Sequence, residues 1–300
     1  MKKIVVTKDL NLSPEEKERL NKLGKVEYYN DLAKTPEEWL KRCEGADIIC
    51  TGIFGLKQKV YELENIFISL PFVGVGFLDL DKLKSRNIKI SNSPGCNTEA
   101  VSEWIMAMIL NLLLQLPKYI NNLNSKFEES KINKSLSGKN ISILGKGHIG
   151  SRVGMIAEKF EMNVKYFMRG DNLMESIKDA DVIVNTLSLN QSTIGLLDKK
   201  FFNFLKKDSY FVTITALEIY DTEAMLEALE KNILAGVATD CGSIQVGNVQ
   251  DPFYIKMIEH PKILATPHIA YNTDVERRKA NKMMIDNIEA YLNSKPINLI

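Results

Sequence analysis

The chain has 300 residues, and its 45% hydrophobic content is sufficient for a packed core and for about two domains. Its 39 lysines and arginines nearly balance its 38 aspartates and glutamates. A balanced charge creates no overall field that would attract nucleic acid or an anionic membrane, so neither partner is predicted and a small-molecule ligand is favoured. The basic first residues contain too short an apolar stretch for a signal peptide, and a cytoplasmic protein is predicted.

The cysteines indicate reduced thiols. They form no close pair of the kind that binds a metal, and four cysteines in 300 residues do not make a disulfide framework, so no metal site is predicted. The most apolar long segment, residues 104–116, contains Asn111 and Gln115 and is too short and polar to span a bilayer. The cysteines are Cys43, Cys50, Cys96 and Cys241.

The first hundred residues alternate strand and helix patterns, which is typical of a parallel α/β sheet. Two helices begin with a hydroxyl residue, a proline and two acids, at Ser13 and Thr35; this pattern caps free amides and suits the helix dipole. A turn-rich crossover at 92–97 follows, and a second domain begins there. The predicted strands are 3–7, 26–29, 47–51, 72–76 and 89–91, and the predicted helices are 13–23 and 36–43.

The rest of the chain repeats the alternation and predicts a second, doubly wound α/β sheet. A helix at 99–116 crosses over, residues 127–137 form a polar connector, and a last helix near 275–293 returns to the first domain. The predicted strands are 141–144, 164–167, 182–185, 210–214, 235–239 and 263–265.

Residues 141–154 give the clearest indication of function. An apolar strand leads into Gly145, Gly147 and Gly150 at the spacing of a dinucleotide-binding loop, and a helix begins there. The first glycine permits the tight turn, the second lets the backbone approach a pyrophosphate, and the third allows close helix–strand packing. The alternative is an ordinary glycine-rich strand-to-helix turn. The predicted cofactor-binding loop is Gly145, Lys146, Gly147, His148, Ile149 and Gly150.

The end of the second strand of this domain indicates which cofactor binds. An acid there would bond the ribose diol and repel a 2′-phosphate. Met168 occupies that position and Arg169 can pair with a phosphate, so NADP is favoured over NAD. The alternative is that Arg169 is merely solvated and Asp171 supplies the acid.

Several segments, in order, resemble the D-2-hydroxyacid dehydrogenases, the family that includes glyoxylate, glycerate and phosphoglycerate dehydrogenases. The resemblance implies two Rossmann-like doubly wound parallel-sheet domains with a cleft between them. Residues 1–96 with 277–300 would form a flavodoxin-like substrate domain, and residues 97–276 the dinucleotide-binding domain. The implied reaction is hydride transfer between nicotinamide and a small 2-keto or 2-hydroxy acid or a related carbonyl. The segments are 73–76, 92–103, 136–139, 180–189 with Thr193, and 266–270.

The resemblance also implies site residues. His268 would be the proton donor, which suits an imidazole just past a strand end, although an isolated histidine is more often a buried structural one. Val75 and Gly76 would bind substrate, and Asp240 would contact the nicotinamide amide. The helix at 99–116 resembles the family's dimer helix and favours a homodimer, although such an apolar helix is more often core. Further cofactor contacts would be Leu187, Ser188 and Ile214.

The sequence departs from the family at two catalytic positions. Ala216 stands where an arginine would bind the substrate carboxylate, and Ser243 stands where a glutamate would support His268. Lysine or backbone amides do not reproduce the geometry of the arginine, and without the carboxylate the imidazolium loses a stabilising partner. Leu78 and Asp79 also depart from the usual Asp-Asn, and Glu218 is better explained as a solvated turn carboxylate than as a substitute acid.

Two interpretations follow. The chain is an NAD(P)-dependent oxidoreductase of a 2-keto or 2-hydroxy acid, or of a related carbonyl without the usual carboxylate. Alternatively, it is a catalytically silent dinucleotide-binding sensor or interaction protein on the same fold. A methyltransferase with a glycine loop is a weaker alternative because it does not explain residues 266–270.

Overall fold

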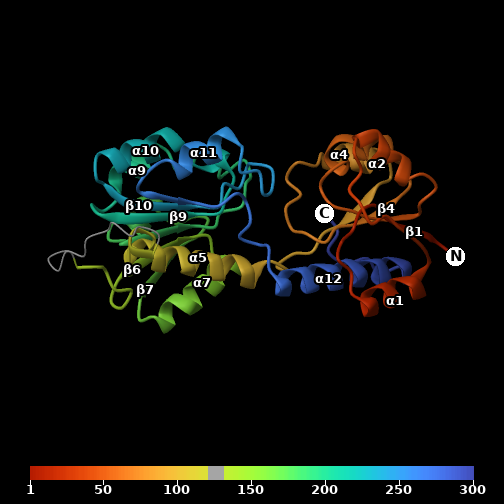
Figure 1. The fold of residues 1–300 in the computed structure, drawn as a ribbon, viewed down its shortest axis with the longest axis horizontal. Helices are drawn as coiled ribbons and strands as arrows, with labels where there is room; N and C mark the ends of the chain where they lie inside the picture. Colours follow the sequence, from red (N-terminus) through yellow and green to blue (C-terminus); the bar gives the residue numbers. More distant parts are fainter. Residues whose placement is uncertain (121–131) are drawn as a thin grey trace. The chain divides into compact units, whose positions relative to one another are not determined.

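The computed structural model describes residues 1–120 and 132–300, which divide into two compact units. The first unit contains Met1–Asn97 and Thr273–Ile300, and the second contains Thr98–Asn272. Each unit has one all-parallel sheet with helices packed on it (Figure 1). The prediction of two parallel-sheet α/β domains is therefore confirmed. Part of the predicted connector, residues 127–131, lies outside the described residues.

The sheet of the first unit has the strand order β2-β1-β3-β4-β5, which is the order of flavodoxin-like folds. The order along the chain reverses between β1 and β3. In sheets of this kind ligands bind outside the carboxyl ends of the strands at that reversal. The strands are β1 (Lys3–Val6), β2 (Lys25–Tyr28), β3 (Ile48–Cys50), β4 (Phe67–Ser69) and β5 (Lys89–Ser91).

The helices of the first unit begin where the sequence supplies caps. The Ser13 hydroxyl accepts a hydrogen bond from the Glu16 amide, and the Glu16 carboxylate accepts one from the Ser13 amide, so the predicted cap forms in both directions. The last helix packs beside the first one, where Arg19 bonds Asp286 and Glu289. The helices are α1 (Pro14–Leu23), α2 (Pro36–Arg42), α3 (Leu56–Lys59), the 3₁₀ turn η1 (Val60–Glu62), α4 (Leu80–Ser85) and α12 (Asp274–Leu292).

Two predicted elements are wrong. The strand placed at 72–76 is a loop, and the strand that was missed is β4, whose three residues are fully buried between β3 and β5. Residues 73–76 alternate valine with glycine, which imitates a strand, but Pro71 lies just before this segment and the glycines have no side chain to pack. The helix predicted at 99–116 ends at Leu113, because Gln115 has a left-handed backbone with φ of 51°.

The sheet of the second unit has the order β11-β10-β9-β8-β6-β7. The order along the chain reverses between β6 and β8, and the glycine loop follows β6 at this point. The strands are β6 (Asn140–Leu144), β7 (Asn163–Phe167), β8 (Val182–Asn185), β9 (Ser209–Thr213), β10 (Leu234–Thr239) and β11 (Ile263–Ala265).

Helices cover both faces of this sheet (Figure 1), and an apolar cluster fills the space between the sheet and each layer of helices. α5 (Thr98–Leu113) and α7 (His148–Lys159) pack on one face, with Ile105, Ile109 and Val153 fully buried. The other face carries a larger cluster that includes Phe201, Phe202 and Phe211. The remaining helices are α6 (Leu116–Ile120), α8 (Leu173–Ile177), α9 (Lys199–Phe204), the 3₁₀ turn η2 (Leu217–Ile219), α10 (Thr222–Glu230) and α11 (Pro252–Ile258).

Among the described residues, no helix has the length and apolar character needed to cross a bilayer.

An ion-pair cluster joins α9 and α10 and makes a pH-dependent contribution to stability. Lys199 and Lys231 lie 2.7 Å and 2.5 Å from the two carboxylate oxygens of Glu227, and they lower the pKa of Glu227 from 4.5 to about 2. Because the folded protein lowers the pKa of Glu227, the ionised carboxylate stabilises the fold at pH values above 4.5. This contribution to stability is lost as the pH falls toward 2. We expect Glu227→Gln to lower the melting temperature slightly at pH 7, and this difference to shrink in acid and in high salt.

Candidate active site in the second unit

The glycine loop has the backbone that its sequence predicts. Gly145 has φ of 100°, and its amide donates to the Phe167 carbonyl over 2.9 Å. A methyl carbon on Gly150 would lie 2.0 Å from the Gly145 carbonyl oxygen, so only glycine fits. At Gly147 such a carbon would meet nothing within 4 Å, so this side of the loop is open. The loop is therefore tight where it packs and open where an anion would approach.

The first turn of α7 presents unpaired donors at this open side. Among the described residues, the amides of His148, Ile149 and Gly150 donate to no protein atom, and the first helical bond is from Ser151 to Gly147 over 2.9 Å. These amides and the helix dipole form an anion-binding site, which suits a pyrophosphate. The side chain of Lys146 turns aside, with its ammonium 4.7 Å from the ring centre of Tyr166.

The end of β7 places a cation beside this loop region. Met168 is 48% exposed, and Arg169 is exposed and forms no ion pair with a described residue. The Asp171 carboxylate accepts from the Met168 amide over 2.8 Å, so Asp171 closes its own turn. Asp171 was the alternative acid for a ribose diol, and this bond occupies one of its oxygens.

Polar residues at the ends of β8 and β9 support the loop. The Asn185 amide donates to the hydroxyls of Thr213 and Thr215 over 3.2 Å and 2.8 Å. The Thr186 hydroxyl lies between the carbonyls of Leu144 and Gly145, at 2.9 Å and 3.1 Å. Sequence analysis missed these roles, although the polar endings of two buried strands indicated them.

The other predicted cofactor contacts are distributed around this edge. Leu187 and Ile214 are half-buried, whereas Ser188 is exposed and its carbonyl accepts from Thr193 over 2.8 Å. A methyl carbon on Gly242 would lie 3.1 Å from the Ile214 carbonyl, so the segment after β10 lies against the segment after β9.

Asp240, just after β10, organises the loop that carries the histidine. It is 3% exposed, and its carboxylate accepts from the Thr266 hydroxyl and from the amides of Ile269 and Ala270, both over 2.8 Å. Burial raises the pKa of Asp240 despite these donors. Asp240 therefore holds residues 266–270 in place, a role the sequence did not predict.

His268 lies within this held loop in a left-handed conformation, with φ of 57°. Its Nδ1 lies 3.1 Å from the Ile244 carbonyl oxygen, which assigns the Nδ1 proton to that bond. Among the described residues Nε2 has no partner. The ring edge also contacts Tyr271, with 6.1 Å between centroids. The arrangement fixes the tautomer and leaves Nε2 available to exchange a proton.

The substrate loop proposed for the first unit also contains free donors. Leu78 donates to the Val75 carbonyl over 3.0 Å, but the amides of residues 73–77, which include Val75 and Gly76, donate to no described protein atom. A loop of unpaired amides suits an anionic or carbonyl oxygen.

Comparison with known proteins places the chain in a family. The family model described as "D-isomer specific 2-hydroxyacid dehydrogenase, NAD binding domain" matches residues 106–270, which is more than half of the chain. The chain belongs to the D-isomer specific 2-hydroxyacid dehydrogenases. This confirms the family predicted from the sequence, whose relatives are dehydrogenases of 2-hydroxy acids, and identifies a domain for a nicotinamide cofactor.

Individual relatives support the assignment to this family. The chain is 26% identical over 276 residues to a D-2-hydroxyacid dehydrogenase (NAD+) of Lacticaseibacillus paracasei, with 83% of each chain covered. It is 28% identical over 242 residues to D-3-phosphoglycerate dehydrogenase of Bacillus subtilis (strain 168); this covers 75% of the chain but 45% of that relative, so the chain spans less than half its length. An acyclic imino acid reductase in complex with NADPH and D-Arg has a similar fold, with a TM-score of 0.85, 23% identity and 99% of both chains covered.

Ala216 and Ser243, the two positions predicted to depart from the family pattern, lie close together. Ser243 accepts a hydrogen bond from the Leu217 amide over 2.9 Å, and Leu217 follows Ala216 directly. Ser243 also precedes Ile244, whose carbonyl holds His268. Ser243, which accepts from the turn at Leu217, is therefore the direct neighbour of the residue whose carbonyl bonds His268. Glu218 is exposed, as expected of a solvated turn carboxylate.

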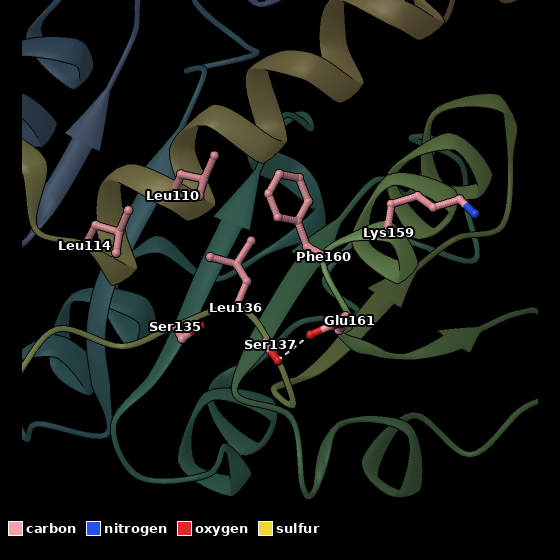
Figure 2. A pocket seen from close by; sticks show the side chains of 8 residues that line it. All are labelled: Leu110, Leu114, Ser135, Leu136, Ser137, Lys159, Phe160 and Glu161. Carbon is pink, nitrogen blue, oxygen red and sulfur yellow. Dashed lines mark hydrogen bonds between the residues drawn. The ribbon is translucent and has the colours of Figure 1, made fainter.

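The cavity of about 380 Å³ shown in Figure 2 lies elsewhere in the second unit. It is lined by the ends of α5 and α7 and by residues 135–137 and 161, and the hydroxyl of Ser137 donates to the carboxylate of Glu161 over 2.8 Å. These residues lie at the amino end of β6, whereas the glycine loop follows its carboxyl end. The cavity is therefore no part of the dehydrogenase site.

Proposed function

We propose that this protein is an NAD(P)-dependent oxidoreductase that interconverts a small 2-keto acid, or a related carbonyl compound, and its alcohol. The observation that supports it most strongly is His268, held by the Ile244 carbonyl at Nδ1 and free at Nε2. A bound nicotinamide supplies or accepts the hydride at the carbonyl carbon. In reduction, His268 protonated at both nitrogens gives its Nε2 proton to the carbonyl oxygen, and in oxidation the unprotonated Nε2 takes the proton from the hydroxyl.

The chain's own residues hold the reactants in this proposal. The amides of residues 148–150 and the open Gly147 bind the pyrophosphate, with Leu187, Ser188 and Ile214 along the rest of the cofactor. Asp240 positions the His268 loop and so acts through the histidine. The first unit, through Val75 and Gly76, binds the substrate.

We further infer that NADP is preferred over NAD. Arg169 lacks an ion-pair partner among the described residues, no acid occupies position 168, and Asp171 is bonded to its own turn. A guanidinium suits the 2′-phosphate of NADP. The imino acid reductase of similar fold is itself complexed with NADPH.

The preference is tested by exchanging the charges at the end of β7. We expect Arg169→Ala to weaken NADPH binding at least tenfold, or by about 1.4 kcal/mol, and to leave NADH binding unchanged. Met168→Asp should favour NADH instead. Dissociation constants for both cofactors, measured by nicotinamide fluorescence, decide the matter. Equal NADPH affinity in wild type and Arg169→Ala would contradict the inference.

A silent dinucleotide sensor is the second candidate, and the uncharged Ala216 and Ser243 favour it. Oxidation of NADPH and NADH should be followed with glyoxylate, hydroxypyruvate, pyruvate, carbonyls without a carboxylate, and imines formed from keto acids and amines. Turnover that depends on His268 supports the oxidoreductase. Tight cofactor binding with no oxidation across this panel supports the sensor.

We also propose a cytoplasmic homodimer that pairs through α5. Leu110 and Asn111 on this helix are half-buried, and Glu103 and Ala107 are exposed. Sedimentation of the protein with Ala107→Arg in parallel with the wild type tests the pairing, and an unchanged dimer in the variant contradicts it.

A further inference from the structure

A lysine without a counter-ion lies at the carboxyl edge of the first sheet. Lys8 follows β1 and Gly52 follows β3, at the reversal of strand order. A methyl carbon on Gly52 would lie 3.3 Å from Cδ and 3.9 Å from Nζ of Lys8, so the lysine stem lies over this glycine. Lys8 is half-buried and has no ion-pair partner among the described residues. Its charge is therefore available to a ligand.

The strand ends beneath Lys8 are fixed by buried polar contacts. The Thr7 hydroxyl donates to the Thr51 hydroxyl over 2.7 Å, and the Trp39 indole donates to the same oxygen over 2.8 Å. All three residues are 1% exposed or less. The backbone that carries Lys8 is therefore joined to the backbone that carries Gly52, which gives the ammonium a defined place.

The neighbouring arginine is not available for the same purpose. Arg42 bonds Asp31 over 3.1 Å and Glu38 over 2.6 Å, and it stacks 4.5 Å from the ring centre of Tyr29. Two carboxylates compensate its charge. Lys8 has no carboxylate partner among the described residues. Unlike Arg42, it therefore carries a charge that no described side chain neutralises.

Free amides lie at the same edge. The loop of residues 73–77 follows β4, the neighbour of β3, and its Val75 and Phe77 side chains pack against the cluster that contains Trp39. The strand ends of β1 and β4 are two strand spacings apart, or about 10 Å. Lys8 and these unpaired amides therefore border one small area, where positive charge and donors meet.

We propose that Lys8 binds the carboxylate of a 2-keto-acid substrate, together with the unpaired amides of residues 73–77 in the same unit. The inference rests on the proposed function and deepens it, because it assigns carboxylate-bearing substrates to the site. An ammonium is a point charge and lacks the two parallel N–H donors with which a guanidinium binds a carboxylate. Lys8 therefore attracts the substrate carboxylate, and the amides of residues 73–77 orient it.

The test removes the charge and keeps the stem. Lys8→Met retains the contact with Gly52, Lys8→Arg retains the charge, and Lys25→Met removes an exposed lysine at the amino end of the same sheet as a control. Binding of oxamate, an unreactive 2-keto-acid analogue, is measured on the enzyme saturated with NADPH. We expect Lys8→Met to weaken oxamate at least tenfold and to raise KM for keto acids with kcat little changed. Lys8→Arg should retain most of the affinity.

The outcomes separate this inference from the proposed function. Equal oxamate affinity in wild type and Lys8→Met overturns the role of Lys8, as does a wild-type enzyme that reduces uncharged carbonyls and does not bind oxamate. In both cases the oxidoreductase stands if NADPH is oxidised. Oxamate binding that depends on Lys8, without oxidation of NADPH by any substrate, supports the anion site and overturns the oxidoreductase.

Discussion

Replacement of His268 by asparagine is expected to lower kcat by about 10²–10⁴-fold while cofactor binding is retained, because general acid–base catalysis contributes that much. Asparagine is the informative substitution at this position. It tolerates the left-handed backbone, where φ is 57°, and its amide nitrogen can donate to the Ile244 carbonyl as Nδ1 does. The substitution removes Nε2, together with the ring that contacts Tyr271.

The measurement is single-turnover oxidation of NADPH, with the dissociation constant of NADPH and the melting temperature recorded for the same variant. His268→Ala serves for comparison, since it removes both the proton donor and the bond to Ile244. If His268→Asn retained wild-type kcat, the proton would come from another group and His268 would be structural. Loss of NADPH binding in His268→Asn would assign the histidine to cofactor positioning instead.

The strands of the second unit could be predicted because each is a short segment of buried residues that is bounded by polar or turn-forming residues. β8 and β11 occupy the predicted residues, and the other strands differ by a residue at their ends. The glycine loop was predictable in the same way, since Gly145 and Gly150 have steric reasons to be glycine that hold in any such loop.

The first unit was harder because two neighbouring segments compete for one strand. Residues 66–70 and 72–76 are both apolar and are separated by Pro71. Only the former can pair on both sides, with β3 and β5, and that long-range pairing is invisible in a local pattern. For the same reason the sequence did not point to Lys8, because its place beside Gly52, which follows a different strand, is visible only in the folded structure.

The sequence named the residues of the candidate site, which stay a prediction, but it could not give their hydrogen bonds. His268 and Asp240 come from family motifs, yet the bonds of Asp240 to the amides of Ile269 and Ala270 depend on the folded loop. The sequence analysis predicted that Ser243 occupies the position of the family's glutamate. Only the structure shows that its hydroxyl accepts from Leu217, beside the second changed position.

Replacement of Asp240 by asparagine is expected to destabilise the second unit by about 2–4 kcal/mol and to lower kcat with it. Three donors converge on this buried carboxylate, which only accepts. Asparagine turns one of its oxygens into a donor, which then faces a backbone amide that also donates, that of Ile269 or that of Ala270. The loop must move away to relieve this conflict, and His268 moves with it.

Thermal unfolding of Asp240→Asn at several pH values tests this expectation, with Asp198→Asn as a matched control. Asp198 is an exposed helix cap that bonds the Phe201 amide, and asparagine caps equally well, so little change is expected there. Because burial raises the pKa of Asp240, folding takes up a proton above pH 3.8. The stability from this group therefore declines as the pH rises through the raised value, and the variant lacks that decline. An Asp240→Asn protein with wild-type stability and kcat would show that the carboxylate does not hold the histidine loop.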